Sequence, residues 1–128
     1  MNMIGYVMFG TNNLIKSSDF YDKTLAPLEI VKRNIDQSFF GYANKHNLNE
    51  IIFYITKPYD QKNVTFGNGT LLAFKAKSKE IVDESHSLAL KNGAANEGSP
   101  GLRKGYGNVY YSYIRDLDQN KICIYSED

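Results

Sequence analysis

The sequence predicts an α+β protein built from two βαβββ modules. Each half of the 128-residue chain opens with a short apolar strand that is followed at once by an amphipathic helix. Superposing Tyr6 on Leu71 also brings Asn13 onto Ser78 and Leu25 onto Leu90 without a gap. Because strands, helix caps and helix ends coincide together, the two halves are interpreted as copies of one module.

The first half predicts the element order β-α-β-β-β. Residues 4–9 are apolar and rich in strand formers, which predicts a buried strand. Asn13 is a favourable N-cap for the helix that follows, and Pro27 disfavours helical geometry at Ala26, so the helix is expected to stop there. Three further strands are predicted at residues 28–32, 38–43 and 51–55.

The second half predicts a similar order, in which one segment is expected to be mainly loop. A short strand at residues 71–74 precedes a helix that Ser78 caps and Gly93 ends. Residues 94–107 contain Pro100 and several glycines and are expected to be loop with at most one short strand. Two strands are predicted at residues 108–115 and 121–125. The helical face is expected to carry Ile81, Ser85, Leu88 and Asn92, with Val82 and Ala89 beside it.

The length predicts a single domain, because about 150 residues per domain is usual. Its first module is expected to cover about residues 1–57 and its second about residues 70–128. The polar stretch 58–69, which contains a Gly-Asn-Gly turn, is expected to be the linker between them.

The charge balance argues against nucleic acid and anionic membranes as partners. Fifteen Lys+Arg against fourteen Asp+Glu give a formal net charge of +1, which is too small for a global attractive field. The apolar stretches are too short and interrupted to form a signal segment or a membrane span. The single cysteine, Cys123, cannot form an intramolecular disulfide, so a cytoplasmic location is expected.

Six short segments of the sequence form a set that can be compared with known families. In the first half they are GTNNL at 10–14, FY at 20–21 and LAPL at 25–28, and in the second half GNGT at 67–70, GSPGLR at 98–103 and RDLDQNK at 115–121. Together they resemble the glyoxalase/bleomycin resistance protein/extradiol dioxygenase group, the vicinal oxygen chelate (VOC) superfamily. The resemblance covers essentially the whole chain. It implies paired modules with curved mixed sheets around a ligand cavity that a second subunit commonly completes, so a homodimer is expected.

The same resemblance argues against a divalent metal as cofactor. Metal-dependent members carry a His on the first strand of each module and a Glu on the last strand, and these positions correspond here to Tyr6, Leu71 and Cys123. Leu71 has no donor atom, and the other two are poor substitutes for the usual ligands. His46 is predicted in a turn, and His86 is predicted as a solvated or boundary residue of the second helix, so neither is expected to bind metal.

The resemblance and the alternation of strand side chains also predict a ligand site. Side chains of one parity share a sheet face, and a ring with a hydroxyl tip suits a cavity wall. Each of these residues also has a simpler interpretation. The tyrosines would only pack across strands, the cysteine would be a small apolar residue of a buried strand, and the arginine would be solvated in its loop. The residues expected to bind the ligand are Tyr6, Leu71, Arg103, Tyr111, Tyr113 and Cys123, with the arginine at the rim. Such a pocket predicts a flat or aromatic acid as ligand.

Two functions follow from these observations. The first is a metal-free relative that binds a small aromatic or apolar molecule without chemistry. The alternative is a glyoxalase-type (lactoylglutathione-lyase-like) or dioxygenase-like metalloenzyme with an altered metal site. A domain kept only for dimerisation or regulation is a third possibility.

Overall fold

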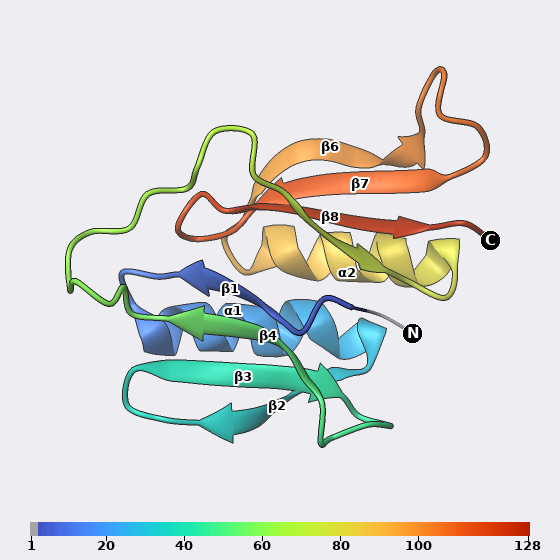
Figure 1. Cartoon of the computed structure of the whole chain (residues 1–128). Helices are drawn as coiled ribbons and strands as arrows, with labels where there is room; N and C mark the ends of the chain where they lie inside the picture. The colour runs from blue at the N-terminus through green and yellow to red at the C-terminus, as the bar shows by residue number, and fades with distance from the viewer. Residues whose placement is uncertain (1–2) are drawn as a thin grey trace.

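The structure, a computed structural model that describes residues 3–128, contains two four-stranded mixed sheets and two α-helices (Figure 1). The first sheet has the order β1-β4-β3-β2, and its strands are β1 (Val7–Gly10), β2 (Ile30–Ile35), β3 (Phe39–Asn44) and β4 (Ile51–Thr56). The second has the order β5-β8-β7-β6, with β5 (Leu72–Lys75), β6 (Ala95–Leu102), β7 (Tyr110–Arg115) and β8 (Lys121–Ser126). The predicted α+β class is confirmed.

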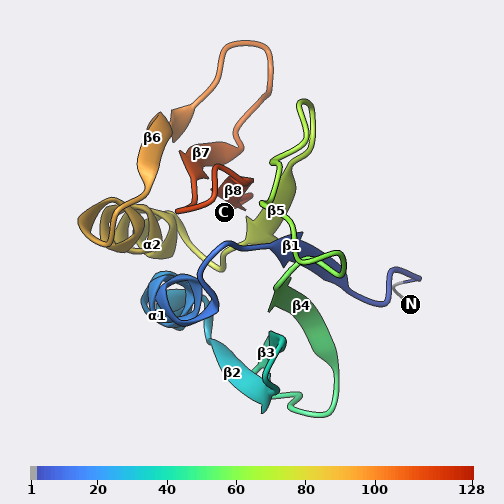
Figure 2. The same ribbon diagram turned by 90° about the vertical axis from the view of Figure 1, so that its left-hand side faces the viewer.

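Both sheets have the same pattern of strand pairing. The first strand of each half lies parallel to the last, and the remaining neighbours are antiparallel. Helices α1 (Leu14–Leu25) and α2 (Lys79–Lys91) pack against each other, and Figure 2 shows them side by side with one curved sheet against each. Each sheet therefore has one face covered by a helix and one face open.

The predicted helix caps are confirmed. The side chain of Asn13 accepts a hydrogen bond from the Lys16 amide at 3.1 Å, and the Ser78 hydroxyl accepts one from the Ile81 amide at 3.3 Å. Gly93, after the end of α2, has a φ of 106°, a conformation that glycine adopts without strain. Local capping chemistry thus positions both helices as expected.

Several strand predictions were wrong at their boundaries, and the buried strand predicted at residues 4–9 is confined to Val7–Gly10 and only partly buried. Leu28 belongs to a 3-10 turn, Ala26–Leu28, and β2 begins only after Glu29, whose φ of 62° reverses the chain direction. Residues 94–107, predicted as loop with at most one short strand, contain the eight-residue strand β6. This strand lies at a sheet edge and pairs only with β7, with two register shifts, and an edge position tolerates its proline and glycines.

The buried face of α2 differs from the predicted one by about one position. It consists of Val82, Ser85, His86 and Ala89. His86 is only 4% exposed, so its prediction as a solvated or boundary residue was wrong. The helix packs against β6, β7 and β8 through a face centred on Val82 and His86 rather than on Ile81. Burial lowers the pKa of the His86 imidazole.

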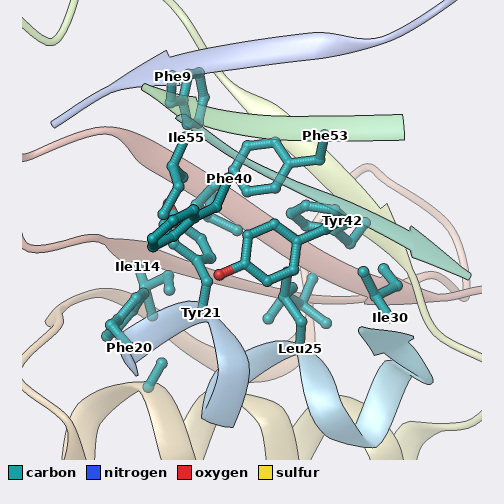
Figure 3. Close-up of a cluster of buried hydrophobic side chains, with 14 of the residues drawn as sticks. Phe9, Phe20, Tyr21, Leu25, Ile30, Phe40, Tyr42, Phe53, Ile55 and Ile114 are labelled. Atoms are coloured by element: carbon teal, nitrogen blue, oxygen red, sulfur yellow. The ribbon is translucent and has the colours of Figure 1, made fainter. Parts of the chain in front are cut away.

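The hydrophobic core lies between the sheets and the two helices and is rich in aromatic rings. Figure 3 shows Tyr21 of α1 among Tyr42 and Phe53 of the first sheet, and the Tyr21 and Phe53 ring centroids are 5.1 Å apart. Phe53 also contacts Phe74 of β5 at 5.6 Å, edge to face. These contacts join the two halves of the chain through apolar burial.

A buried polar cluster also joins the halves. The Tyr21 hydroxyl donates to the carboxylate of Asp116 at 2.5 Å, and the Asn120 side chain donates both to Asp116 at 3.0 Å and to the Gly10 carbonyl at 3.1 Å. The amides of Asp118 and Asn120 donate to the other oxygen of Asp116. Burial raises the pKa of Asp116, so these donors offset a substantial desolvation cost.

The substitution Tyr21→Phe tests this cluster. It keeps the ring but removes the hydroxyl that donates to Asp116, and loss of a buried hydrogen bond to a carboxyl costs about 1–3 kcal/mol. We expect the free energy of unfolding, measured by urea denaturation, to fall by that amount. Tyr59 is fully exposed, so Tyr59→Phe is the matched control and should leave stability unchanged. Equal stabilities of the two variants would contradict the assigned role of the cluster.

Candidate functional site

A cavity of about 680 Å³ lies on the open face of the second sheet. In β7 and β8 the residues that alternate with its lining, Ile114, Ile122 and Ile124, are buried in the core on the α2 side. The cavity lies over β5, β7 and β8 and extends to the segment that connects β6 to β7. It therefore occupies the face that the helix leaves uncovered.

The structure brings together five of the six residues predicted to bind a ligand. Leu71, Arg103, Tyr111, Tyr113 and Cys123 all line the cavity. Tyr6 does not. It precedes β1, is 59% exposed, and packs edge to face on Tyr54 of the first sheet with ring centroids 5.0 Å apart. That a ligand contacts the five lining residues stays a prediction.

The predicted ligand-binding set did not include the other lining residues, which are Ala73, Tyr106, Val109, Tyr125 and Glu127. Strand alternation carried a usable signal for two of them, because Ala73 shares the parity of Leu71 and Tyr125 that of Cys123. Tyr106 and Val109 lie between β6 and β7 and have no such periodic signal.

Tyrosine rings form one wall of the cavity. Tyr111 and Tyr113 stack at 6.0 Å with an interplanar angle of 14°, and Tyr125 lies 5.8 Å from Tyr111 at 31°. Tyr106 contacts Tyr111 edge to face at 6.1 Å. Burial raises the pKa of Tyr113, so its phenol stays protonated and can donate a hydrogen bond. The wall offers flat apolar surface with hydroxyl groups along it.

Arg103 is held at the cavity by the backbone that precedes it. Its guanidinium donates to the carbonyl of Ser99 at 2.7 Å and to that of Gly101 at 3.0 Å, and it lies 5.6 Å from the centre of the Tyr113 ring. A Cβ atom on Gly98 would come within 2.9 Å of the Tyr113 ring and 3.0 Å of the guanidinium. Glycine at this position therefore permits the close approach of arginine and ring.

The remaining polar groups of the cavity are neutral or paired. Glu127 forms an ion pair with Lys75, which offsets its negative charge. Burial raises the pKa of the Cys123 thiol to about 11, so the thiol is protonated at neutral pH. By contrast, Arg103 makes no ion pair with any residue in the range 3–128.

The residues present do not fit the metal site that the family resemblance implies. Leu71 offers no donor atom, Cys123 holds its proton, and Tyr6 lies on the other sheet. His46 pairs with Glu29 on the surface, and His86 is buried under the second sheet. Within the described residues, no three or more His, Cys, Asp or Glu side chains are grouped so that they could hold an ion.

Solved structures with the same architecture place the chain in a family. A glyoxalase/bleomycin resistance protein from Albidiferax ferrireducens T118 is 35% identical, with a TM-score of 0.87 over 99% of this chain and 100% of its own. A glyoxalase/bleomycin resistance protein/dioxygenase family enzyme from Burkholderia phytofirmans PsJN is 21% identical, with a TM-score of 0.72 over 96% of this chain and 97% of its own. The fosfomycin resistance protein FosX from Mesorhizobium loti is 12% identical, with a TM-score of 0.70 over 100% and 94% of the two chains.

Paired modules with one helix-covered and one open sheet face define a glyoxalase-type fold. The chain belongs to the glyoxalase/bleomycin resistance protein family, within the VOC superfamily. No protein-family model matches the sequence, and no curated protein sequence matches it either. No helix in the part of the chain that the structure describes is long and apolar enough to cross a membrane.

Proposed function

We propose that this protein binds a small aromatic or apolar molecule in the cavity of its second sheet, without a metal ion. The observation that carries the proposal is the wall formed by Tyr111, Tyr113 and Tyr125, whose rings face a cavity of about 680 Å³ rather than the core. A cavity of this size accepts a molecule of several rings.

Two features favour binding over plain packing of the tyrosines. Stacked and tilted rings leave their outer faces available for a further ring, which gains both apolar burial and stacking. Leu71 and Ala73 add apolar surface on β5 and the segment before it, so the wall continues across the sheet. The family membership is consistent with this use of the open sheet face.

The substitution Tyr111→Ala tests the binding proposal. Tyr111 contacts three other rings, so its removal should weaken a bound aromatic ligand by about tenfold, which corresponds to ~1.4 kcal/mol. A thermal-shift screen of small aromatic compounds supplies the ligands, and calorimetric titration measures their affinities. The control Tyr59→Ala, in the linker, should leave affinity unchanged. If the ligands bind the Tyr111→Ala variant as tightly as the wild-type protein, the binding site lies elsewhere.

Metal independence is tested separately. The protein purified without chelator should contain no stoichiometric divalent metal, and titration with zinc, nickel and manganese should show no tight one-to-one binding. The physical reason is the donor set, in which Leu71 cannot coordinate and the Cys123 thiol keeps its proton. Tight binding at one site would favour the alternative of a metalloenzyme with an altered ligand set.

We also propose that the chain forms a homodimer through the open face of the first sheet. That face carries the ring cluster of Tyr6, Tyr54 and Phe39, and Met8 is 45% exposed beside it. A second copy would remove this apolar surface from water, as the closed symmetry of most soluble oligomers allows.

Sedimentation equilibrium tests the dimer. At micromolar concentration the mass should be about twice 14.5 kDa, and Met8→Glu should shift it towards the monomer because a charge would be buried in the interface. The matched change Leu117→Glu, at an exposed position in the turn between β7 and β8, should leave the dimer intact. A wild-type mass near 14.5 kDa would reject the proposal.

A further inference from the structure

We infer that the cavity accepts an aromatic monoanion, whose charged group binds Arg103 and whose uncharged end lies towards Glu127. This inference rests on the proposed function and adds to it the charge and the orientation of the ligand. It follows from the unequal charges of the groups that line the cavity and from the way in which Arg103 is held.

The Arg103 guanidinium is positioned before any ligand arrives. Its Nη1 donates to the carbonyls of Gly101 and Leu102 at 3.0 and 3.4 Å, and its Nη2 donates to Ser99 at 2.7 Å. None of these contacts uses Nε and only one uses Nη2, so within residues 3–128 the N–H of Nε and the second N–H of Nη2 have no acceptor. Neighbouring N–H groups of a guanidinium can hold a carboxylate with two hydrogen bonds.

The positive charge of Arg103 also lacks a protein counter-ion. Carbonyl oxygens orient the guanidinium but carry no net charge, and no carboxylate of the described chain pairs with it. The Tyr113 ring beneath it, 5.6 Å away, excludes water from one side. An anion placed there would meet a fixed cation in partly apolar surroundings, where the attraction is stronger than in water.

Glu127 disfavours a second negative charge on the part of the ligand that lies near it. Its carboxylate also lines the cavity, and its pairing with Lys75 leaves no net positive charge there for a second anion. A dianion that stacks on the tyrosine wall with one carboxylate at Arg103 would direct the other towards Glu127. Repulsion between like charges would then offset part of the binding free energy.

Calorimetric titration of the full chain with three matched probes tests the inference. The probes are naphthoate, its neutral amide naphthamide, and a naphthalene dicarboxylate with its carboxylates at opposite ends. Naphthoate should bind about tenfold more tightly than naphthamide, as expected for one charge-assisted pair. The dicarboxylate should bind more weakly than naphthoate, and Glu127→Gln should raise the affinity for the dicarboxylate by a larger factor than that for naphthamide.

Variants at Arg103 separate charge recognition from structural damage. Arg103→Gln should lower the affinity for naphthoate by about tenfold and that for naphthamide by a smaller factor, because only the carboxylate gains from the charge of the guanidinium. Arg103→Lys, which keeps the charge but loses the paired N–H groups, should give an intermediate affinity. Gly98→Ala should also lower naphthoate affinity, because its Cβ would displace the guanidinium.

The outcomes distinguish this inference from the proposed function. If naphthoate and naphthamide bind equally well, or if Arg103→Gln weakens both equally, the monoanion inference is wrong while binding of aromatic molecules stands. A dicarboxylate that binds as tightly as naphthoate would overturn the role of Glu127. If none of the three probes binds, the proposed function fails together with the inference.

Discussion

The buried carboxyl of Asp116 is the constraint that fixes the second sheet relative to the first half of the chain. A carboxyl that is 3% exposed is tolerated only when its oxygens are hydrogen-bonded, and its donors come from both halves. Tyr21 reaches it from α1, and Asn120 links it to the end of β1 through the Gly10 carbonyl. The Asn12 amide donates to Asp118 of the same turn at 2.9 Å. The turn that starts β8 is thereby bound to the first module.

From this turn, strand alternation determines both the core and the cavity. Cys123 is paired with Ala73 on β5 and with Tyr113 on β7, and Tyr125 is paired with Tyr111, so these side chains share the open face. A slip of one residue would bring the isoleucines of β8 into the cavity and press tyrosine hydroxyls against α2. The burial of the isoleucines and the position of the tyrosines on the open face therefore both follow from the same strand register. The packing of the core thus determines which side chains line the cavity.

Local patterns in the sequence predicted much of this arrangement, and non-local effects account for the errors. The caps at Asn13 and Ser78 depend on neighbouring residues and were visible directly. The internal repeat correctly paired Tyr6 with Leu71 as equivalent positions, but equivalent positions lie on two different sheets and so do not share one cavity. The burial of His86 depends on how α2 is rotated against its sheet. Two adjacent faces of the helix have similar polarity, so the sequence alone does not show which of them is buried.

The irregular strand β6 explains why the charged end of the cavity could be predicted only in part. Its register against β7 shifts between Gly98 and Gly101, so Ser99 falls outside the regular pairing and its carbonyl can accept from Arg103. Such a bulge depends on the partner strand, whereas the proline and glycines that permit it suggest a loop when the sequence is read alone. Carbonyl acceptors in this irregular strand and the space beside Gly98 hold the guanidinium over Tyr113. The irregular pairing of β6 at the sheet edge thus holds the Arg103 guanidinium in a fixed position beside the tyrosine rings of the cavity.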